Sequence, residues 1–138
     1  MKQFKKALYT AKVHTIGARD GASRSDDGRL DIKHSVPGGP SDGTNPEQLF
    51  AAGWSSCFEG AMGLAAGKHK IILPEDTAID AEVDLCNDDS GYFLQARLNV
   101  SLPGLGRDVA QALIDEAHAT CPYSKATRGN IAVDIRLV

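Results

Sequence analysis

The sequence contains few cysteines, few aromatic residues and no marked excess of either charge. Its three cysteines stand at positions 57, 86 and 121 of 138 residues, without a C-x-x-C pair. A secreted disulfide scaffold needs a denser set, so we expect a reducing, cytoplasmic location. Aromatic residues make up 6% of the chain and charged residues 24%, with a net charge of -3. This balance indicates no basic surface, so we expect no nucleic-acid partner.

Long hydrophobic runs and common cofactor motifs are also absent from the sequence. No stretch approaches the roughly 20 apolar residues of a membrane span, and the basic N-terminus lacks the apolar core of a secretory signal. The histidines at positions 14, 34, 69 and 118 form no H-E-x-x-H motif or close pair, and the glycine pairs match no nucleotide-binding pattern. We therefore expect no membrane partner, no metal site and no bound cofactor.

The remaining composition is that of an ordinary globular protein. Hydrophobic residues make up 42% of the chain, and its length suits a single domain over residues 1–138. The expected elements are strands at 4–16 and 30–36 around a turn-rich segment at 17–29, a helix from 44 to about 68, a strand hairpin of 78–86 and 92–102, a helix at 107–119 and a strand at 131–138. This order is typical of an α+β domain.

The helix that begins near Thr44 has the clearest start signal in the chain. Thr44 can cap it, Pro46 suits its first turn, and Glu47 completes a capping-box pattern. Apolar residues lie almost all round this helix, which is typical of burial on most sides, and one short chain can hardly cover it alone. Its glycines recur every seven residues at 53, 60 and 67, and each costs roughly 1 kcal/mol relative to alanine. We infer that another backbone comes close to this face or that the helix bends.

Two of the three cysteines are candidates for redox chemistry. Cys57 shares a helix face with two of these glycines, so it is either a small packing residue or a functional thiol. Cys121 precedes Pro122, which places it near the N-cap of a short helix where exposed N–H groups favour a thiolate; alternatively, it merely ends the preceding helix. Cys86 shares a strand face with acidic residues that oppose thiolate formation, and we expect a bystander. Three arginines of the turn-rich segment could activate a thiolate, and spacing does not choose among them: Arg19, Arg24 and Arg29.

Two segments resemble the signature regions of the organic hydroperoxide resistance proteins, which belong with the osmotically inducible protein C family. They are T-N-P-E-Q-L-F-A-A-G-W-S-S-C-F-E-G-A at 44–61 and C-P-Y-S-K-A-T-R-G-N at 121–130. An A-R-D-G turn near residue 19 extends the resemblance over essentially the whole chain. The turn reads G-A-R-D-G, and so departs from the family pattern where a second glycine is expected before the arginine.

The resemblance implies an intertwined homodimer in which antiparallel sheets from both chains wrap central buried helices. It implies that Cys57 is the peroxidatic cysteine and Cys121 the resolving one. Arg19 would match the activating arginine, and Glu47 the carboxylate that holds it. On a straight helix Glu47 lies roughly 15 Å from Cys57, so a shared site needs a bend near Gly53 or a Glu47 donated by the partner chain.

The expected function is that of a thiol-dependent peroxidase that reduces organic hydroperoxides to alcohols. The Cys57 thiolate would become a sulfenic acid, and Cys121 would convert it into a disulfide. The family's usual reductant is a lipoyl dithiol such as dihydrolipoamide, which would reduce this disulfide by exchange. Phe50 and Phe58 would favour organic over hydrogen peroxide. Two alternatives stay open: a sister-subfamily peroxidase with a broader peroxide preference, and a non-enzymatic redox sensor.

Overall fold

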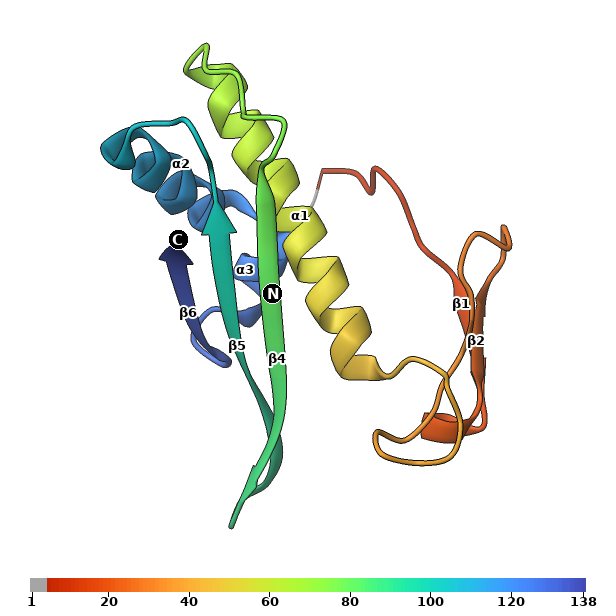
Figure 1. Ribbon diagram of the computed structural model, residues 1–138. Coiled ribbons are helices and arrows are strands. Elements are labelled where there is room, and N and C mark those ends of the chain that lie inside the picture. Colours follow the sequence, from red (N-terminus) through yellow and green to blue (C-terminus); the bar gives the residue numbers. More distant parts are fainter. Residues whose placement is uncertain (1–4) are drawn as a thin grey trace. The chain divides into compact units, whose positions relative to one another are not determined.

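The computed structural model describes residues 5–138, which form helices and strands of an α+β fold (Figure 1). The elements are β1 Val13–Ile16, the 3-10 turn η1 Ala18–Asp20, β2 Ala22–Ser25, β3 Asp31–Lys33, α1 Pro46–Lys68, β4 Ala78–Asp88, β5 Gly91–Ser101, α2 Arg107–Thr120, α3 Pro122–Thr127 and β6 Ala132–Leu137. The α+β class is confirmed. The chain divides into two compact units, Met1–Pro46 and Glu47–Val138. The single domain over 1–138 stays a prediction.

The first unit is a three-stranded antiparallel sheet in the order β1-β2-β3. The sequence prediction is wrong at β2, which lies inside the predicted turn-rich segment, and among residues 5–16 only β1 is strand. Residue 4 of the predicted first strand lies outside the described part. The A-S-R-S sequence of β2 lacks apolar alternation, and this strand forms because β1 and β3 pair with it on both sides.

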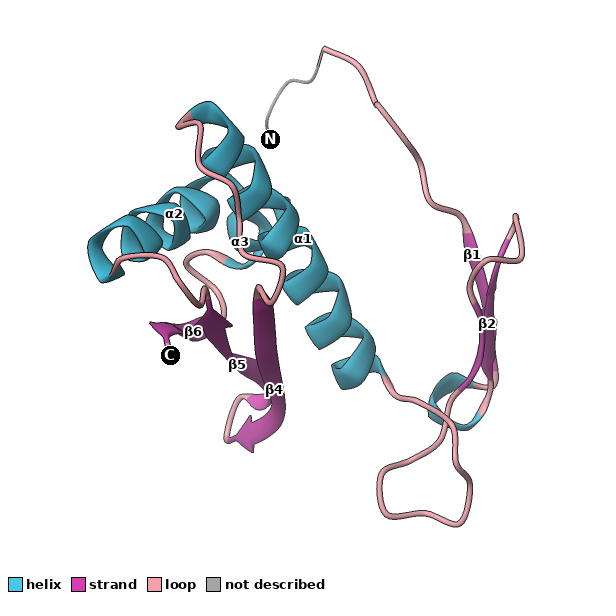
Figure 2. Cartoon of the chain, turned by 45° about the horizontal axis from the view of Figure 1, so that its top comes forward, coloured by secondary structure: helices cyan, strands magenta, loops and turns pink. Residues whose placement is uncertain are grey.

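The second unit packs its helices on one face of a mixed sheet (Figure 2). Strands β4 and β5 form a long antiparallel hairpin, as predicted, from Ala78 opposite Ser101 to Asp88 opposite Gly91. Strand β6 instead runs parallel to β5, so this sheet is not wholly antiparallel as expected. The reason is the connection: α2 and α3 form the crossover that a parallel pair requires.

The core of the second unit lies between α1, α2 and the sheet. One face of α1 carries three large side chains at four-residue spacing, all fully buried: Trp54, Phe58 and Met62. They share one cluster with alternate residues of β5 and with the inner face of α2: Ala96, Leu98, Val100, Ala110, Ile114 and Ala117. The helix predicted at 107–119 is confirmed as α2.

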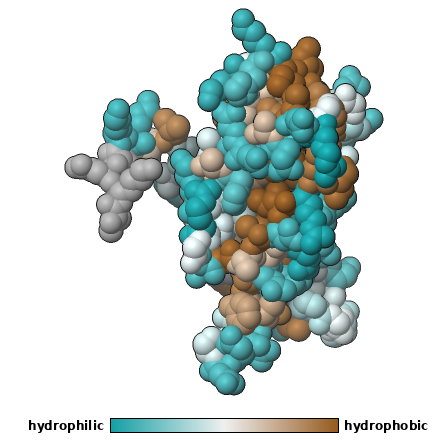
Figure 3. All heavy atoms as spheres, turned by 90° about the vertical axis from the view of Figure 1, so that its left-hand side faces the viewer, coloured by the Kyte–Doolittle hydropathy of each residue, from teal (hydrophilic) through white to brown (hydrophobic). Residues whose placement is uncertain are grey.

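The opposite face of α1 is left open by the second unit. Ala52, Ser56 and Gly60 lie along it at helical spacing and are exposed, and Leu64 is 80% exposed. Apolar atoms also gather in a band on the face of the chain shown in Figure 3. The predicted burial of this helix on most sides therefore holds for one face within the described chain.

The outer face of the sheet carries a cluster of ion pairs. Arg97 holds Asp84 with two hydrogen bonds, from Nη1 to Oδ2 at 2.8 Å and from Nη2 to Oδ1 at 2.9 Å. Its Nε donates to Glu82 Oε2 at 3.0 Å, and Gln95 Nε2 donates to Asp84 Oδ2 at 2.8 Å. The bonds from Arg97, and then from Gln95, lower the pKa of Asp84 from its ordinary 3.8 to about 2.

We predict that this cluster contributes to the acid dependence of stability. Because the folded pKa of Asp84 lies below its unfolded value, the contribution is complete above pH 3.8 and is lost as pH falls toward about 2. Urea denaturation should show Asp84→Asn less stable than the wild type at pH 7, with the difference shrinking toward pH 2. Asp80→Asn, on the same face of β4, is the control. An equal deficit of Asp84→Asn at pH 7 and pH 2 would contradict this linkage.

Candidate functional site

The thiols of Cys57 and Cys121 meet within the second unit, although 64 positions separate them in the sequence. Cys57 lies half-buried on α1, whereas Cys121 is fully buried between α2 and α3. Both side chains pack in the same apolar cluster, near enough that Cys121 affects the pKa of Cys57. Cys86 lies apart on β4, where its thiol faces the Asp84 carbonyl oxygen at 4.0 Å. The structure thus brings together the two cysteines that the sequence selected.

Cys121 holds the corner between two helices. It ends α2, with its N–H donating to the Ala117 carbonyl at 2.8 Å, and it is the N-cap of α3, with Pro122 in the first turn as predicted. Its side chain makes no capping hydrogen bond. The backbone amide of Tyr123, in the first turn of α3, instead acts to lower the pKa of Cys57. The N–H groups at this helix start were expected to stabilise a thiolate of Cys121, but the Tyr123 amide instead favours the thiolate of Cys57.

The surroundings of Cys57 within this unit oppose its ionisation. Burial raises the pKa of the Cys57 thiol above its ordinary 9.0, and the hydrogen bond and charge of Cys121 add to that rise. The Tyr123 amide acts in the other direction, because an N–H stabilises a thiolate. The pKa of Cys57 is nevertheless raised, so its surroundings in the second unit do not favour a thiolate.

Close packing of α3 on α1 brings the two cysteines together. Trp54 Nε1 donates to Ser124 Oγ at 3.2 Å, and both side chains are fully buried. The Tyr123 ring lies over Gly53, where an added Cβ would come within 2.5 Å of the Tyr123 hydroxyl oxygen. Phe50 meets Trp54 and Tyr123 edge-on, with ring centroids 5.9 and 6.1 Å away. The close approach predicted for the glycine face is therefore confirmed at Gly53, but a side chain makes it rather than a backbone.

The other glycines of the seven-residue repeat have no such neighbour. A Cβ at Gly60 or Gly67 would meet no heavy atom of residues 5–138 within 4 Å. Both residues are exposed on α1. The sequence pattern therefore combined one glycine that packs inside the unit with two that face outward.

His118 is a neighbour of the site that sequence reasoning did not select. Its ring lies 6.5 Å from that of Phe58, and its backbone carbonyl accepts a hydrogen bond from the Arg128 guanidinium. Burial lowers the pKa of His118, Arg128 adds to that effect, and Asp115 opposes it. Its Nδ1 is buried without a hydrogen-bond partner in the described part of the chain. The Arg128 contact ties the end of α2 to the end of α3, on either side of Cys121.

Arg19 lies in the first unit, in a turn with unusual backbone geometry. Gly17 and Ala18 both have left-handed backbone angles, with φ of 74° and 52°. This region costs an L-residue roughly 1–2 kcal/mol, so Ala18 is strained where the family resemblance leads one to expect glycine. Gly21 closes the turn, and a Cβ there would lie 1.7 Å from the Ile16 carbonyl oxygen.

Glu47 opens α1 in the second unit. Figure 1 shows α1 as one uninterrupted helix from Pro46 to Lys68, so the bend considered near Gly53 is not observed. Ten residues of helix separate Glu47 from Cys57, which corresponds to roughly 15 Å along the axis. The other alternative, donation of Glu47 by a partner chain, stays a prediction.

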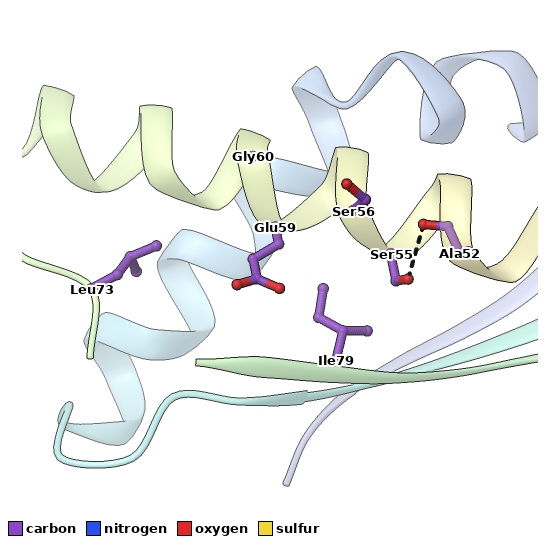
Figure 4. A pocket seen from close by; sticks show the side chains of 7 residues that line it. All are labelled: Ala52, Ser55, Ser56, Glu59, Gly60, Leu73 and Ile79. Atoms are coloured by element: carbon purple, nitrogen blue, oxygen red, sulfur yellow. Dashed lines mark hydrogen bonds between the residues drawn. The ribbon is translucent and has the colours of Figure 1, made fainter. Parts of the chain in front are cut away.

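A hollow of about 640 Å³ lies between α1 and the start of β4, away from the cysteine pair (Figure 4). Its lining is Ala52, Ser55, Ser56, Glu59, Gly60, Leu73 and Ile79. The Glu59 carboxylate projects between Leu73 and Ile79. The Ser55 hydroxyl turns back to the helix, donating to the Ala51 carbonyl at 2.7 Å. This hollow belongs to the open face of α1.

Within residues 5–138, no three histidine, cysteine or acidic side chains are grouped to hold a metal ion. Among the helices of the same residues, none has the length and apolar character to cross a membrane.

Comparison with known proteins places the cysteine pair in a family context. Residues 38–136 match the OsmC-like protein family. The chain belongs to this family. The match includes both cysteine-bearing segments, and the predicted resemblance is confirmed.

Individual relatives of this OsmC-like chain cover nearly its full length. It is 45% identical over 136 residues to the organic hydroperoxide resistance protein of Xanthomonas axonopodis pv. citri, covering 96% of each chain. It is 45% identical over 136 residues to the organic hydroperoxide resistance protein OhrB of Bacillus subtilis, covering 95% of this chain and 98% of that protein. The crystal structure of OhrB superposes with a TM-score of 0.90 at 44% identity, over 96% of this chain and 100% of that chain.

We predict that Gly53→Ala destabilises this OsmC-like protein. Alanine is the better helix former by about 1 kcal/mol, but its Cβ would displace the Tyr123 ring, and overpacking typically costs about 1–3 kcal/mol. Chemical denaturation should show a net loss of stability and slower disulfide formation between Cys57 and Cys121. Gly63→Ala, whose Cβ meets Leu73 Cδ1 at an ordinary 3.9 Å among the described residues, is the control. A gain of stability in Gly53→Ala would show that α3 does not pack as tightly as this.

Proposed function

We propose that this chain is a thiol-dependent peroxidase that reduces organic hydroperoxides to alcohols. The observation that carries the proposal is the neighbouring pair of Cys57 and Cys121 in one apolar cluster. Relatives at 45% identity are named organic hydroperoxide resistance proteins, which supports the choice of substrate class. Phe50 and Phe58, which pack in the same cluster, favour an organic peroxide over hydrogen peroxide.

The unequal burial of the two thiols supports their order in the reaction. The half-buried Cys57 thiolate attacks the peroxide O–O bond, and the released alkoxide takes a proton to leave as the alcohol. The resulting Cys57 sulfenic acid condenses with the thiol of the fully buried Cys121, which forms a disulfide and releases water. A dithiol such as dihydrolipoamide then reduces the disulfide by two exchange steps and becomes a cyclic disulfide itself.

Activation of Cys57 requires a charge from outside the second unit. Its own surroundings raise the pKa of the thiol, and the Tyr123 amide offsets that rise only in part. Arg19 is permanently charged and is the residue that the family resemblance selects. We assign Arg19 the role of lowering the pKa of Cys57, and Glu47 the role of orienting the guanidinium.

The open face of α1 supports a homodimer as the working unit. Exposed small residues, together with Leu64 at 80% exposure, form a surface that a second copy of α1 can cover. Glu47 and Cys57 of one chain lie roughly 15 Å apart along the helix. In a dimer, Glu47 of one copy can instead act at Cys57 of the other. The three free cysteines are consistent with a cytoplasmic location.

We predict distinct effects for substitutions at the three cysteines. Cys57→Ser should abolish turnover of cumene hydroperoxide with dihydrolipoamide, since no sulfenic acid can form. Cys121→Ser should complete one turnover and stop at the sulfenic acid, which dimedone labelling and mass spectrometry detect. Cys86→Ser is the control and should keep wild-type activity. Full activity in Cys57→Ser would disprove the mechanism. Wild-type turnover that prefers hydrogen peroxide and thioredoxin would indicate the sister-subfamily activity. No wild-type turnover with any dithiol would indicate a redox sensor.

We predict that activity can be restored between two defective subunits. In a mixed dimer of Cys57→Ser and Glu47→Ala chains, one site combines an intact Cys57 with an intact Glu47 only if Glu47 acts across the dimer. One of the two sites is then restored, so such mixed dimers should recover up to about half the activity of a wild-type dimer. Each mutant homodimer stays impaired. Sedimentation analysis checks that the species measured are dimers. A monomeric wild type, or mixed dimers no better than their parents, would refute the trans arrangement.

A further inference from the structure

A small polar network crosses the sheet of the first unit beside the Arg19 turn. Thr15 Oγ1 and Ser23 Oγ are 2.8 Å apart, and Ser23 Oγ and His34 Nε2 are 2.6 Å apart. Thr15 lies on β1 and Ser23 opposite it on β2, while His34 directly follows β3. Ser23 and His34 are 6% and 8% exposed. Hydrogen bonds between side chains therefore tie together all three strands of this sheet.

The network closes the base of the turn that carries Arg19. Thr15 lies two residues before Gly17, where the turn begins, and Ser23 two residues after Gly21, where it ends. The backbone N–H of His34 donates to the Gly21 carbonyl at 2.9 Å. His34 thus holds the end of the turn twice, through its backbone at Gly21 and through its ring at Ser23.

The turn needs such a restraint because its backbone is strained. Ala18, directly before Arg19, has a φ of 52°, which alanine adopts reluctantly. Without support, the chain can relieve the strain by moving Ala18 out of the left-handed region, and the direction of the Arg19 side chain would change with it. The hydrogen bonds on both sides of the turn oppose that movement.

A serine beside a histidine also suggests a nucleophile, but the surroundings argue against one here. Both side chains are almost fully buried, so a substrate has no access to the Ser23 hydroxyl. The second ring nitrogen of His34, Nδ1, is buried without a hydrogen-bond partner in the described residues, so no carboxylate orients the ring as a hydrolase requires. The pair is suited to holding the backbone.

We propose that Ser23 and His34 are positioning residues that hold the strained Arg19 turn in the conformation that activates Cys57. This inference rests on the proposed function, in which Arg19 lowers the pKa of Cys57. Loss of either side chain would leave the guanidinium present but misdirected. The defect would therefore appear in the pH dependence of Cys57 reactivity.

The test is the pH profile of Cys57 alkylation by iodoacetamide, measured in a Cys86→Ser, Cys121→Ser background so that one thiol remains. His34→Leu and Ser23→Ala should move the midpoint upward by about 1 unit, and lower the rate at neutral pH by about tenfold. His34→Gln, which keeps a hydrogen-bonding group near Ser23, should stay close to the wild type. Ser25→Ala is the matched control, because its hydroxyl on the same strand bonds to Asp27 instead. Circular dichroism checks that each variant is folded. If His34→Leu does not fold, the alkylation profile of Ser23→Ala tests the inference instead.

A second substitution separates positioning from general stability. Adding Ala18→Gly to His34→Leu should return the midpoint toward the wild-type value, because glycine adopts the left-handed conformation without restraint. Glycine also relieves the strain at position 18, so thermal melts should show both variants fully folded at the assay temperature, which excludes a rescue through regained stability. Arg19→Ala is the reference: an unchanged midpoint there overturns the proposed role of Arg19. A raised midpoint in Arg19→Ala with unchanged midpoints in the folded His34 and Ser23 variants overturns this inference alone.

Discussion

The packing of α3 against α1 at Gly53 is the contact on which the site depends. With no side chain at that position, the Tyr123 ring can lie directly on the helix. The buried hydrogen bond from Trp54 to Ser124 holds the two helices in this register. Cys121, at the start of α3, is thereby brought to Cys57. A larger residue at position 53 would move the whole corner rather than one side chain.

The same packing creates an electrostatic difficulty for the thiol it positions. Burial raises the pKa of Cys57 and so reduces the fraction of thiolate. One amide of α3 offsets only part of that cost. A permanent charge solves the problem best if it comes from a separate element, because a guanidinium fixed inside the apolar cluster would itself be buried. The proposed function assigns this charge to Arg19, which belongs to the first unit.

Local signals explain which features the sequence could predict. The start of α1 at Pro46 and the β4–β5 hairpin follow from capping residues and strict alternation, and both are confirmed. Strand β2 was missed because its pairing with two neighbours, rather than its own residues, makes it a strand. Spacing alone could not pair Cys57 with Cys121. Their contact depends on the packing of α3 on α1, which the hydrogen bond between Trp54 and Ser124 holds across 70 positions of sequence. The glycine repeat did carry the signal at Gly53, but its partner Tyr123 was not recognisable beforehand.

The Arg19 turn shows how a departure from a family pattern can be compensated nearby. Alanine at position 18 makes the left-handed backbone more costly than glycine would, yet it also leaves the turn fewer alternative conformations once it is held. The hydrogen bonds of Ser23 and His34 restrain the backbone of this turn. A glycine there would need less support from the surrounding hydrogen bonds. Alanine at 18 and the polar pair at 23 and 34 are therefore best understood as parts of one arrangement, in which strain and restraint together define where the positive charge points.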